Sequence, residues 1–399
     1  MKNEQNVPQV RFKGFTDAWE QRKFGDLGSV AMCKRIFKEQ TTATGEIPFY
    51  KIGTFGGEPD AFISRELFEE YKEKFSYPEV GDMLISASGT IGRTVEYTGK
   101  DEYFQDSNIV WFKHDDRIDN SFLRCLYSIV EWSGIEGSTI KRLYNDNFLK
   151  TEFMLPCVAE QRKVGSFFSH LDNLITLHQR KCETLQKLKK SMLQKMFPKN
   201  GSLYPEIRFA GFTDAWEQRK LEEICEQVKE TVDPQLTPDT KFYEYSMPAF
   251  DDNSRADIVS GYDMNSIRKV INAPCLLINK LNVRKKRIWL VEKPEKNAVC
   301  SAEFVPVTSD VSDLSFLKYT TLKDDFTAYL EDCSSGSSNS QKRVTPDVIM
   351  KATIQNPTIA EQSIIGTFFS NLDSIITLHQ RKLETLKKMK KSMLQKMFI

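Results

Sequence analysis

Residues 158–197 read VAEQRKVGSFFSHLDNLITLHQRKCETLQKLKKSMLQKMF, and residues 359–398 repeat them as IAEQSIIGTFFSNLDSIITLHQRKLETLKKMKKSMLQKMF. Neither copy contains proline, and the single glycine of each lies near its start, so each can form one continuous helix. A helix of about 35–40 residues is about 50–60 Å long. Pro198 and Gly201 predict where the first helix ends. The sequence therefore predicts two long helices of the same design.

Apolar residues recur in both copies in alternating steps of four and three, which is the spacing of a coiled-coil seam. An antiparallel pair would hide both seams. Two polar residues interrupt each seam, at His178 and Lys189 and again at His379 and Lys390. The histidines are tolerated or hydrogen-bonded seam residues in the simpler interpretation, and register-setting polar pairs in the alternative. The seam positions are Val164, Phe168, Leu171, Ile175, His178, Cys182, Leu185, Lys189, Met192 and Met196, with their equivalents 201 residues later.

A second repeat precedes each insert. Residues 8–23 read PQVRFKGFTDAWEQRK, and residues 205–220 read PEIRFAGFTDAWEQRK. Between the repeats lie two stretches, roughly 24–140 and 221–340, that barely resemble each other. A constant frame around two different inserts predicts two different recognition modules held in one fixed geometry.

Length and composition exclude several classes of protein. The chain of 399 residues is 40% hydrophobic and 28% charged, which is typical of two or three globular domains. No apolar run approaches the ~20 residues that span a bilayer, and the N-terminal MKNEQNVPQV lacks the apolar part of a signal peptide. We therefore expect a cytoplasmic protein with no membrane partner. A net charge of +1 argues against sequence-independent coating of nucleic acid but allows local basic surfaces.

The inserts contain short apolar runs at 83–85, 108–112, 275–278 and 304–307, separated by polar turns. Such runs are typical of strands. Each insert is therefore predicted to be a mixed α/β domain with a sheet and a few helices.

Polar loops in the inserts are candidates for contact with DNA, because Ser, Asn, Gln, Lys and Arg bind base edges and phosphates. Residues 86–93 (SASGTIGR) match no nucleotide-binding fingerprint, and a simple turn explains them equally well. Their counterpart is the basic stretch 279–287 (NKLNVRKKR), and residues 137–147 (GSTIKRLYNDN) match 338–347 (SNSQKRVTPD). The candidate DNA-binding residues are Ser86, Ser88, Thr90, Arg93, Thr139, Lys141, Arg142, Asn145, Lys280, Asn282, Arg284, Lys285, Lys286, Arg287, Ser340, Gln341, Lys342 and Arg343. We expect Arg284 to Arg287 to contact phosphates more than bases.

Catalytic and metal-binding patterns are missing from the sequence. It has no Walker-type loop, no Cys-x-x-Cys pair among its eight cysteines, and no paired-carboxylate spacing. None of the four histidines (His114, His170, His178 and His379) has a supporting motif. We therefore predict a non-catalytic chain with no metal site and no cofactor of its own.

The half-chain repeat resembles the specificity (S) subunit of type I restriction-modification systems. The resemblance rests on the paired RF-x-GFTDAWEQRK segments, the P-x-x-x-EQ motifs at 156–161 and 357–362, and the helices that end SMLQKMF. It implies an α/β fold in which two mixed α/β target recognition domains are joined by two long antiparallel helices, forming a coiled coil with a pseudo-two-fold internal repeat. The domains expected are 1–152 and 201–353 for target recognition, with 153–200 and 354–399 as the conserved spacer helices.

The resemblance also implies a function and partners. Each recognition domain would read one half of an interrupted, asymmetric site in double-stranded DNA. The helical frame would dock two methyltransferase (M) subunits, which methylate adenine, and through them the restriction/translocase (R) subunits. S-adenosylmethionine, ATP and Mg are expected on these partners. Arg162 is replaced by Ser363 in the second copy, so the two docking surfaces need not be equivalent.

Two other classes stay open from the residues alone. The chain could be a coiled-coil scaffold whose inserts bind proteins, or one insert could be a hydrolase with no known motif. A neighbouring adenine methyltransferase gene would favour DNA recognition, and activity of the purified chain would favour the hydrolase.

Overall fold

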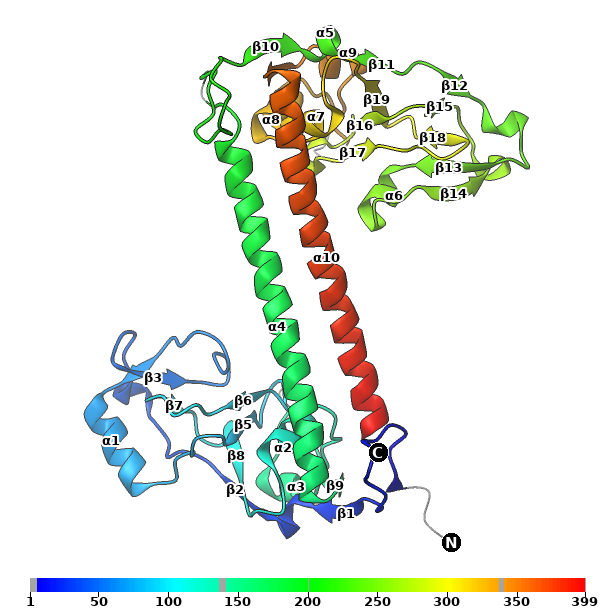
Figure 1. Ribbon diagram of the computed structural model, residues 1–399. Helices are drawn as coiled ribbons and strands as arrows, with labels where there is room; N and C mark the ends of the chain where they lie inside the picture. Colours follow the sequence, from blue (N-terminus) through cyan, green and yellow to red (C-terminus); the bar gives the residue numbers. More distant parts are fainter. Residues whose placement is uncertain (1–5, 136–140, 200, 337–340, 399) are drawn as a thin grey trace. The chain divides into compact units, whose positions relative to one another are not determined.

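The computed structural model describes residues 6–135, 141–199, 201–336 and 341–398. The chain forms two compact units, one made of residues 1–179 with 381–399 and the other of residues 180–380. Each of the two long helices contributes one segment to each unit (Figure 1).

The two long helices are α4 (Val158–Lys195) and α10 (Ile359–Met397), as the sequence predicted. Every predicted seam position is buried or half-buried. Cys182 is only 6% exposed, so it packs as an apolar residue. None of the helices in the described part of the chain is long and apolar enough to cross a membrane.

Within each unit, the two helix segments run in opposite directions. In the first unit Lys390 donates to Asp172 at 2.5 Å, while Phe168 meets Phe398 with ring centroids 6.2 Å apart. The numbering therefore rises along α4 as it falls along α10. The second unit repeats these contacts between Lys189 and Asp373 (2.5 Å) and between Phe197 and Phe369 (6.0 Å). The predicted antiparallel pairing is confirmed in both units.

The repeated Glu-Gln pair fixes the start of each long helix. Glu160 is 1% exposed and accepts two hydrogen bonds of 2.7 Å from Arg11, which belongs to the other repeated segment. Gln161 donates to the Pro156 carbonyl at 2.8 Å and accepts from the backbone N–H of Asp119 at 2.8 Å. The second unit makes the equivalent bonds: Arg208 donates to Glu361, Gln362 donates to the Pro357 carbonyl, and the Asp313 N–H donates to Gln362. In each unit, the repeated segment before the insert is therefore bonded to the first turn of the repeated helix.

The first unit contains three small sheets. A pair is formed by β1 (Glu20–Lys23) and β9 (Glu152–Leu155). A four-stranded sheet has the order β2-β8-β5-β6, and a three-stranded sheet has the order β4-β3-β7. The strands are β2 (Gly28–Ala31), β3 (Ile47–Tyr50), β4 (Phe62–Ile63), β5 (Met83–Ser86), β6 (Thr94–Glu96), β7 (Tyr103–Phe104) and β8 (Ile109–His114), and the helices are α1 (Arg65–Lys74), α2 (Asn120–Tyr127) and α3 (Asn145–Lys150).

The second unit repeats the first two sheets and extends the third, because β14-β13-β18 has the same antiparallel and parallel pairing as β4-β3-β7. β10 (Glu217–Lys220) pairs with β20 (Thr353–Asn356), and a four-stranded sheet has the order β11-β19-β16-β17. Its other sheet has five strands, in the order β12-β15-β18-β13-β14. The strands are β11 (Glu226–Gln227), β12 (Thr231–Val232), β13 (Lys241–Tyr245), β14 (Asp257–Ser260), β15 (Arg268–Val270), β16 (Cys275–Asn279), β17 (Ile288–Val291), β18 (Ala298–Cys300) and β19 (Phe304–Thr308). The helices are α5 (Leu221–Ile224), α6 (Met247–Asp252), α7 (Leu314–Thr321), α8 (Asp324–Asp332) and α9 (Pro346–Met350).

The four predicted apolar runs form the two central strands of each four-stranded sheet, which are β5 and β8 in the first unit and β16 and β19 in the second. All four residues of β5 and all five of β16 are buried. Such continuous burial explains why these strands read as unbroken apolar runs.

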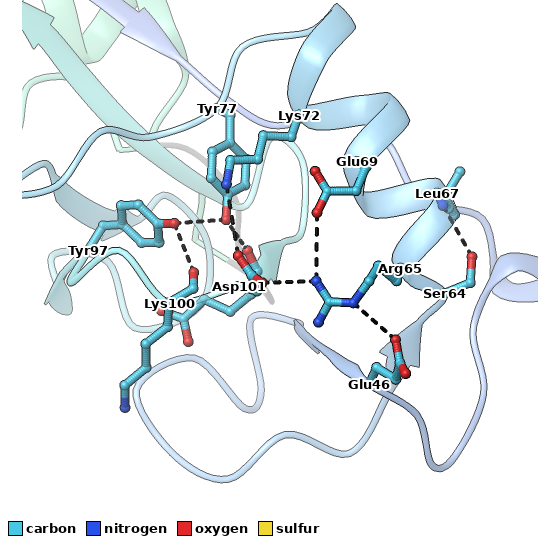
Figure 2. A network of polar contacts seen from close by, with 11 residues as sticks. Glu46, Ser64, Arg65, Leu67, Glu69, Lys72, Tyr77, Tyr97, Lys100 and Asp101 are labelled. Atoms are coloured by element: carbon cyan, nitrogen blue, oxygen red, sulfur yellow. Dashed lines mark hydrogen bonds and ion pairs between the residues drawn. The ribbon is translucent and has the colours of Figure 1, made fainter.

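The three-stranded sheet of the first unit is joined to α1 by polar contacts (Figure 2). Ser64 caps α1 by accepting from the Leu67 N–H, and Arg65 bonds to Glu46 at 3.1 Å and Asp101 at 3.0 Å. Behind them, the hydroxyl groups of Tyr77 and Tyr97 lie 3.1 Å apart. Burial raises the pKa of Tyr77, so its phenol stays protonated at physiological pH. The pairing within this sheet recurs in the second unit, where β13 pairs with β14 and β18, but only the second unit adds β15 and β12 to it.

Candidate nucleic-acid interface

In each unit, the loop that follows the central strand pairs with the Lys-Arg loop that precedes the last short helix. In the first unit, Ser88 and Arg142 form an isolated antiparallel bridge. The Gly89 N–H donates to the Lys141 carbonyl at 3.0 Å, and the Leu143 N–H donates to the Ala87 carbonyl at 2.8 Å. Two candidate loops that are about 50 residues apart in sequence are therefore neighbours.

The second unit makes the same connection with different residues. Leu281 and Arg343 form the bridge. The Asn282 N–H donates to the Lys342 carbonyl at 2.9 Å, and the Val344 N–H donates to the Lys280 carbonyl at 3.0 Å. Both inserts thus build one composite loop surface at the end of the buried strand, and most of the candidate residues belong to it.

Two of the candidate hydroxyl groups in the first unit hold the loop rather than face outward. Ser86 is 2% exposed, donates to the Thr90 carbonyl at 2.6 Å and accepts from the Arg93 N–H at 3.0 Å. Ser88 is 4% exposed and donates to the side chain of Asn108 at 2.7 Å. Their role in the described structure is to shape the turn.

The exposed candidates of the first unit are Thr90, Arg93, Lys141, Arg142 and Asn145. Arg93 donates to the Phe55 carbonyl at 2.8 Å, which leaves its charge without a carboxylate. Neither Lys141 nor Arg142 has a side-chain partner among the described residues. These three side chains form the basic part of the first composite loop surface.

In the second unit, carboxylates neutralise most of the basic stretch. Arg284 pairs with Glu331 of α8 at 2.5 Å, and Lys286 pairs with Asp324 at the start of the same helix. Lys286 holds the pKa of the Asp324 carboxyl below its usual range. Arg343 pairs with Glu303 at 2.7 Å. DNA phosphates would have to compete with these carboxylates for the cations.

Arg287 differs from its neighbours because it is buried. It is 7% exposed and donates two hydrogen bonds to Asp251, at 2.7 and 2.6 Å. Hydrogen bonding to Arg287 lowers the pKa of Asp251, so the pair stays charged at physiological pH. Lys285 lies 3.8 Å from the same carboxylate. In this arrangement Arg287 anchors the loop, and its contact with DNA stays a prediction.

Lys280 and Lys342 are half-buried, and neither side chain has an ion-pair partner in the described part of the chain. Asn282 has a positive φ of 52°, which turns the loop at that point. Gln341 is exposed beside them. The predicted residues Thr139 and Ser340 lie outside the described residues.

The carboxylates that pair with the basic residues of the second unit were not predicted from the sequence. Asp251, Glu303, Asp324 and Glu331 lie up to 50 residues from the cations that they bind. No spacing rule links a carboxylate of one helix to a loop of a distant hairpin, so sequence carried no signal for them. Asn108 was missed for the same reason.

The chemistry of these surfaces suits the binding of phosphates and base edges. They supply ammonium, guanidinium and amide groups, which bind phosphate oxygens and base edges. Among the described residues, no group of three or more His, Cys, Asp or Glu side chains could hold a metal ion.

Comparison with known proteins identifies the class of protein. Residues 16–187 match the family of type I restriction modification DNA specificity domains. A putative type I restriction enzyme specificity subunit from Haemophilus influenzae is 56% identical over 158 residues, which are 39% of this chain and 41% of the relative. The MjaVIII specificity subunit of Methanocaldococcus jannaschii is 23% identical over 343 residues, covering 79% of this chain and 74% of the relative. The match to the Haemophilus protein spans less than half of that relative's length.

The whole fold is shared with a solved structure. The S subunit of a type I restriction-modification system from M. genitalium superposes with a TM-score of 0.63 at 14% identity, covering 98% of this chain and 99% of that one. Residues 16–187 are thus similar to type I DNA specificity domains, and the whole chain shares the fold of that solved subunit. The resemblance of the whole chain to type I restriction-modification specificity subunits is confirmed, and so is the predicted fold class.

Proposed function

We propose that each unit reads one half of an interrupted, asymmetric DNA site through its composite loop surface. The observation that carries this proposal is the repeated bridge, Ser88 with Arg142 and Leu281 with Arg343. It gives two dissimilar inserts the same backbone platform with different side chains on it. Such a design supports two readers with different base preferences.

Phosphate contacts would supply affinity and base contacts would supply specificity. Lys141, Arg142, Lys280 and Lys342 have no carboxylate partner among the described residues, so they are the cations most available to phosphates. Arg284 and Arg343 would first exchange a carboxylate for a phosphate or a guanine edge.

Methyltransferase subunits are proposed to dock on the long helices. In the first unit, Leu177 of α4 is 61% exposed, and in the second unit Leu378 of α10 is 65% exposed. These residues are equivalent in the repeat, since they are 201 positions apart. An exposed apolar residue at the same place in both copies supports two similar partner sites. S-adenosylmethionine, ATP and Mg would be bound by the methyltransferase and restriction subunits, and this chain would remain a non-catalytic cytoplasmic DNA-recognition subunit.

The test is methylation mapping in cells that carry matched pairs of substitutions. Lys141→Ala with Arg142→Ala should weaken methylation through the first half-site, and Lys342→Ala with Arg343→Ala through the second. Each double variant is the control for the other, since both alter the same platform. Co-purification of the methyltransferase should be unchanged in both. Loss of co-purification with unchanged DNA binding by the remaining complex would contradict the proposal and favour a scaffold.

A further inference from the structure

A cavity of about 560 Å³ in the second unit is lined by an excess of lysine. Its walls come from the last turns of α4, the segment that follows α4, Lys286 of the basic stretch, and the start of α8. Five lysines and two aspartates line it, a formal charge of +3 from these side chains (5 − 2). The lysines are Lys189, Lys190, Lys199, Lys286 and Lys323, and the aspartates are Asp324 and Asp325.

The positive charge of this cavity is only partly compensated. Lys189 pairs with Asp373 at 2.5 Å, Lys286 pairs with Asp324, and Lys323 lies 3.5 Å from Asp325. Lys190 and Lys199 are exposed, and among the described residues neither forms a close ion pair, although Lys190 helps to lower the pKa of Asp324 and Lys199 that of Glu206. Burial lowers the pKa of Lys323, and repulsion from Lys199 acts in the same direction. A bound anion would relieve this repulsion.

The cavity adjoins the candidate DNA interface. Lys286 belongs to the basic stretch after β16 and also lines the cavity. We propose that the cavity binds phosphate groups of the DNA backbone. These phosphates would lie outside the base pairs that the composite loop surface reads. This inference rests on the proposed function and adds a phosphate site that belongs to the helical frame.

In the described part of the first unit, only the helix repeats the lysines of this cavity. Lys189 and Lys190 correspond to Lys390 and Lys391 in the repeat. The capping residues Asp119 and Asp313 make the same bond to the repeated glutamine, and they align α2 with α7. By that alignment Ile129 and Val130 stand where the second unit has Lys323 and Asp324. The phosphate site is therefore asymmetric, and Lys391 provides a matched control.

The experiment measures affinity for duplex DNA against salt concentration, using the full chain with its methyltransferase partner. In Lys190→Glu with Lys199→Glu, the slope of log affinity against log salt should become shallower by about 2, because each phosphate contact contributes ~0.9. Lys391→Glu should leave the slope at the parent value. The neutral pair Lys190→Gln with Lys199→Gln should change the slope in the same direction, which guards against a folding defect caused by the added negative charge.

Inorganic pyrophosphate at constant ionic strength distinguishes a DNA phosphate from a free phosphate ligand. If the site serves DNA, pyrophosphate should bind weakly and compete with duplex DNA in the parent only. Tight pyrophosphate binding that the double variants abolish, with an unchanged DNA slope, would overturn the proposal. So would equal slopes in the parent, the double variants and the Lys391 control. A parent complex without sequence preference would instead refute the proposed function.

Discussion

Lys189 and Lys390 show how a polar seam residue is accommodated. Each lysine pairs with an aspartate of the antiparallel helix at 2.5 Å, so the charge of both seam lysines is balanced. Asp373 also accepts from the Tyr319 hydroxyl at 2.8 Å and lies 3.7 Å from Lys318 of α7. In the described part of the first unit, Asp172 has Arg124 of α2 at 3.8 Å in addition to Lys390. Each aspartate therefore joins the helix pair to the insert of its unit, and the second junction is the tighter one.

We expect Asp373→Asn to lower the free energy of unfolding by about 1–3 kcal/mol, because it leaves two half-buried lysines without their carboxylate. Asp172→Asn is the matched control and should cost less. Urea unfolding of both variants measures the difference, and the exchanged pair Lys189→Asp with Asp373→Lys should restore part of the loss. Equal effects of the two asparagine variants would show that the contacts to α7 add nothing.

Gly165 allows α4 to approach the first turn of α2 closely. A Cβ at this position would lie 2.6 Å from the backbone carbonyl carbon of Ser121. At Gly366 the nearest backbone atom, the Phe316 nitrogen, would be 2.9 Å away. Helix propensity alone would favour alanine by about 1 kcal/mol.

Because backbone atoms cannot easily give way, Gly165→Ala should instead destabilise the protein, by about 1–3 kcal/mol. Gly366→Ala should destabilise it less, and Ser166→Ala on the exposed face of the same helix should be neutral or slightly stabilising. Chemical denaturation would measure all three variants. A stability of Gly165→Ala equal to that of the parent would show that α2 can move away without cost.

At the scale of elements, α8 controls the charge of the basic stretch in the second unit. It contributes Glu331 and Asp324, which bind Arg284 and Lys286. These carboxylates occupy the cations that non-specific DNA would otherwise bind. On the proposed function, the helix would lower the affinity for phosphates in general and make DNA binding depend on further contacts.

Glu331→Gln should consequently raise affinity for non-specific duplex DNA several-fold and steepen its salt dependence by about one phosphate contact. Asp332→Asn removes one charge from an exposed position of the same helix and should have a smaller effect. Fluorescence anisotropy with a duplex that lacks the methylated sequence would measure both. A loss of affinity in Glu331→Gln would mean that the ion pair shapes the loop for DNA instead of shielding it.

The elements that repeat were predictable from sequence, and those that do not repeat were not. The helix over residues 158–197, its apolar seam and its antiparallel pairing were all predicted correctly. The coiled-coil period of the apolar residues and the second copy of the segment made this possible. The buried strands β5 and β16 were visible as apolar runs. The five-stranded sheet of the second unit was not, since β12 and β15 are only two and three residues long and half-exposed.

The sequence predicted which loops are candidates for the site, but not which contacts their side chains make. The match between residues 137–147 and 338–347 identified equivalent Lys-Arg loops in the two inserts, but only the structure shows that each pairs with the loop after β5 or β16. The burial of Arg287 could not be foreseen, because Asp251, its partner, lies 36 residues away on α6. A run of four basic residues therefore looked like one surface, although only part of it faces outward.

At the scale of the whole molecule, we expect the length of the two continuous helices to set the gap between the two DNA half-sites. Inserting one heptad after Leu185 in α4 and a matching heptad in α10 keeps the seam in register and lengthens both helices by about 10 Å. The gap between the two half-sites should then grow by about three base pairs, while the half-sites stay the same.

Methylation mapping of the heptad variant gives both quantities in one experiment. A heptad inserted in α4 alone is the control, since it breaks the match between the seams and should abolish methylation. Changed half-site sequences with an unchanged gap would contradict the ruler-like role of the helices.

The way the two units divide the chain has a consequence for synthesis on the ribosome. The second unit is one uninterrupted stretch, residues 180–380, whereas the first needs residues 381–399 to complete its helix pair. Leu386, Met397 and Phe398 lie in the same hydrophobic core as Trp19. The part of the protein made first therefore has to wait for the part made last, while the middle of the chain can already be folded.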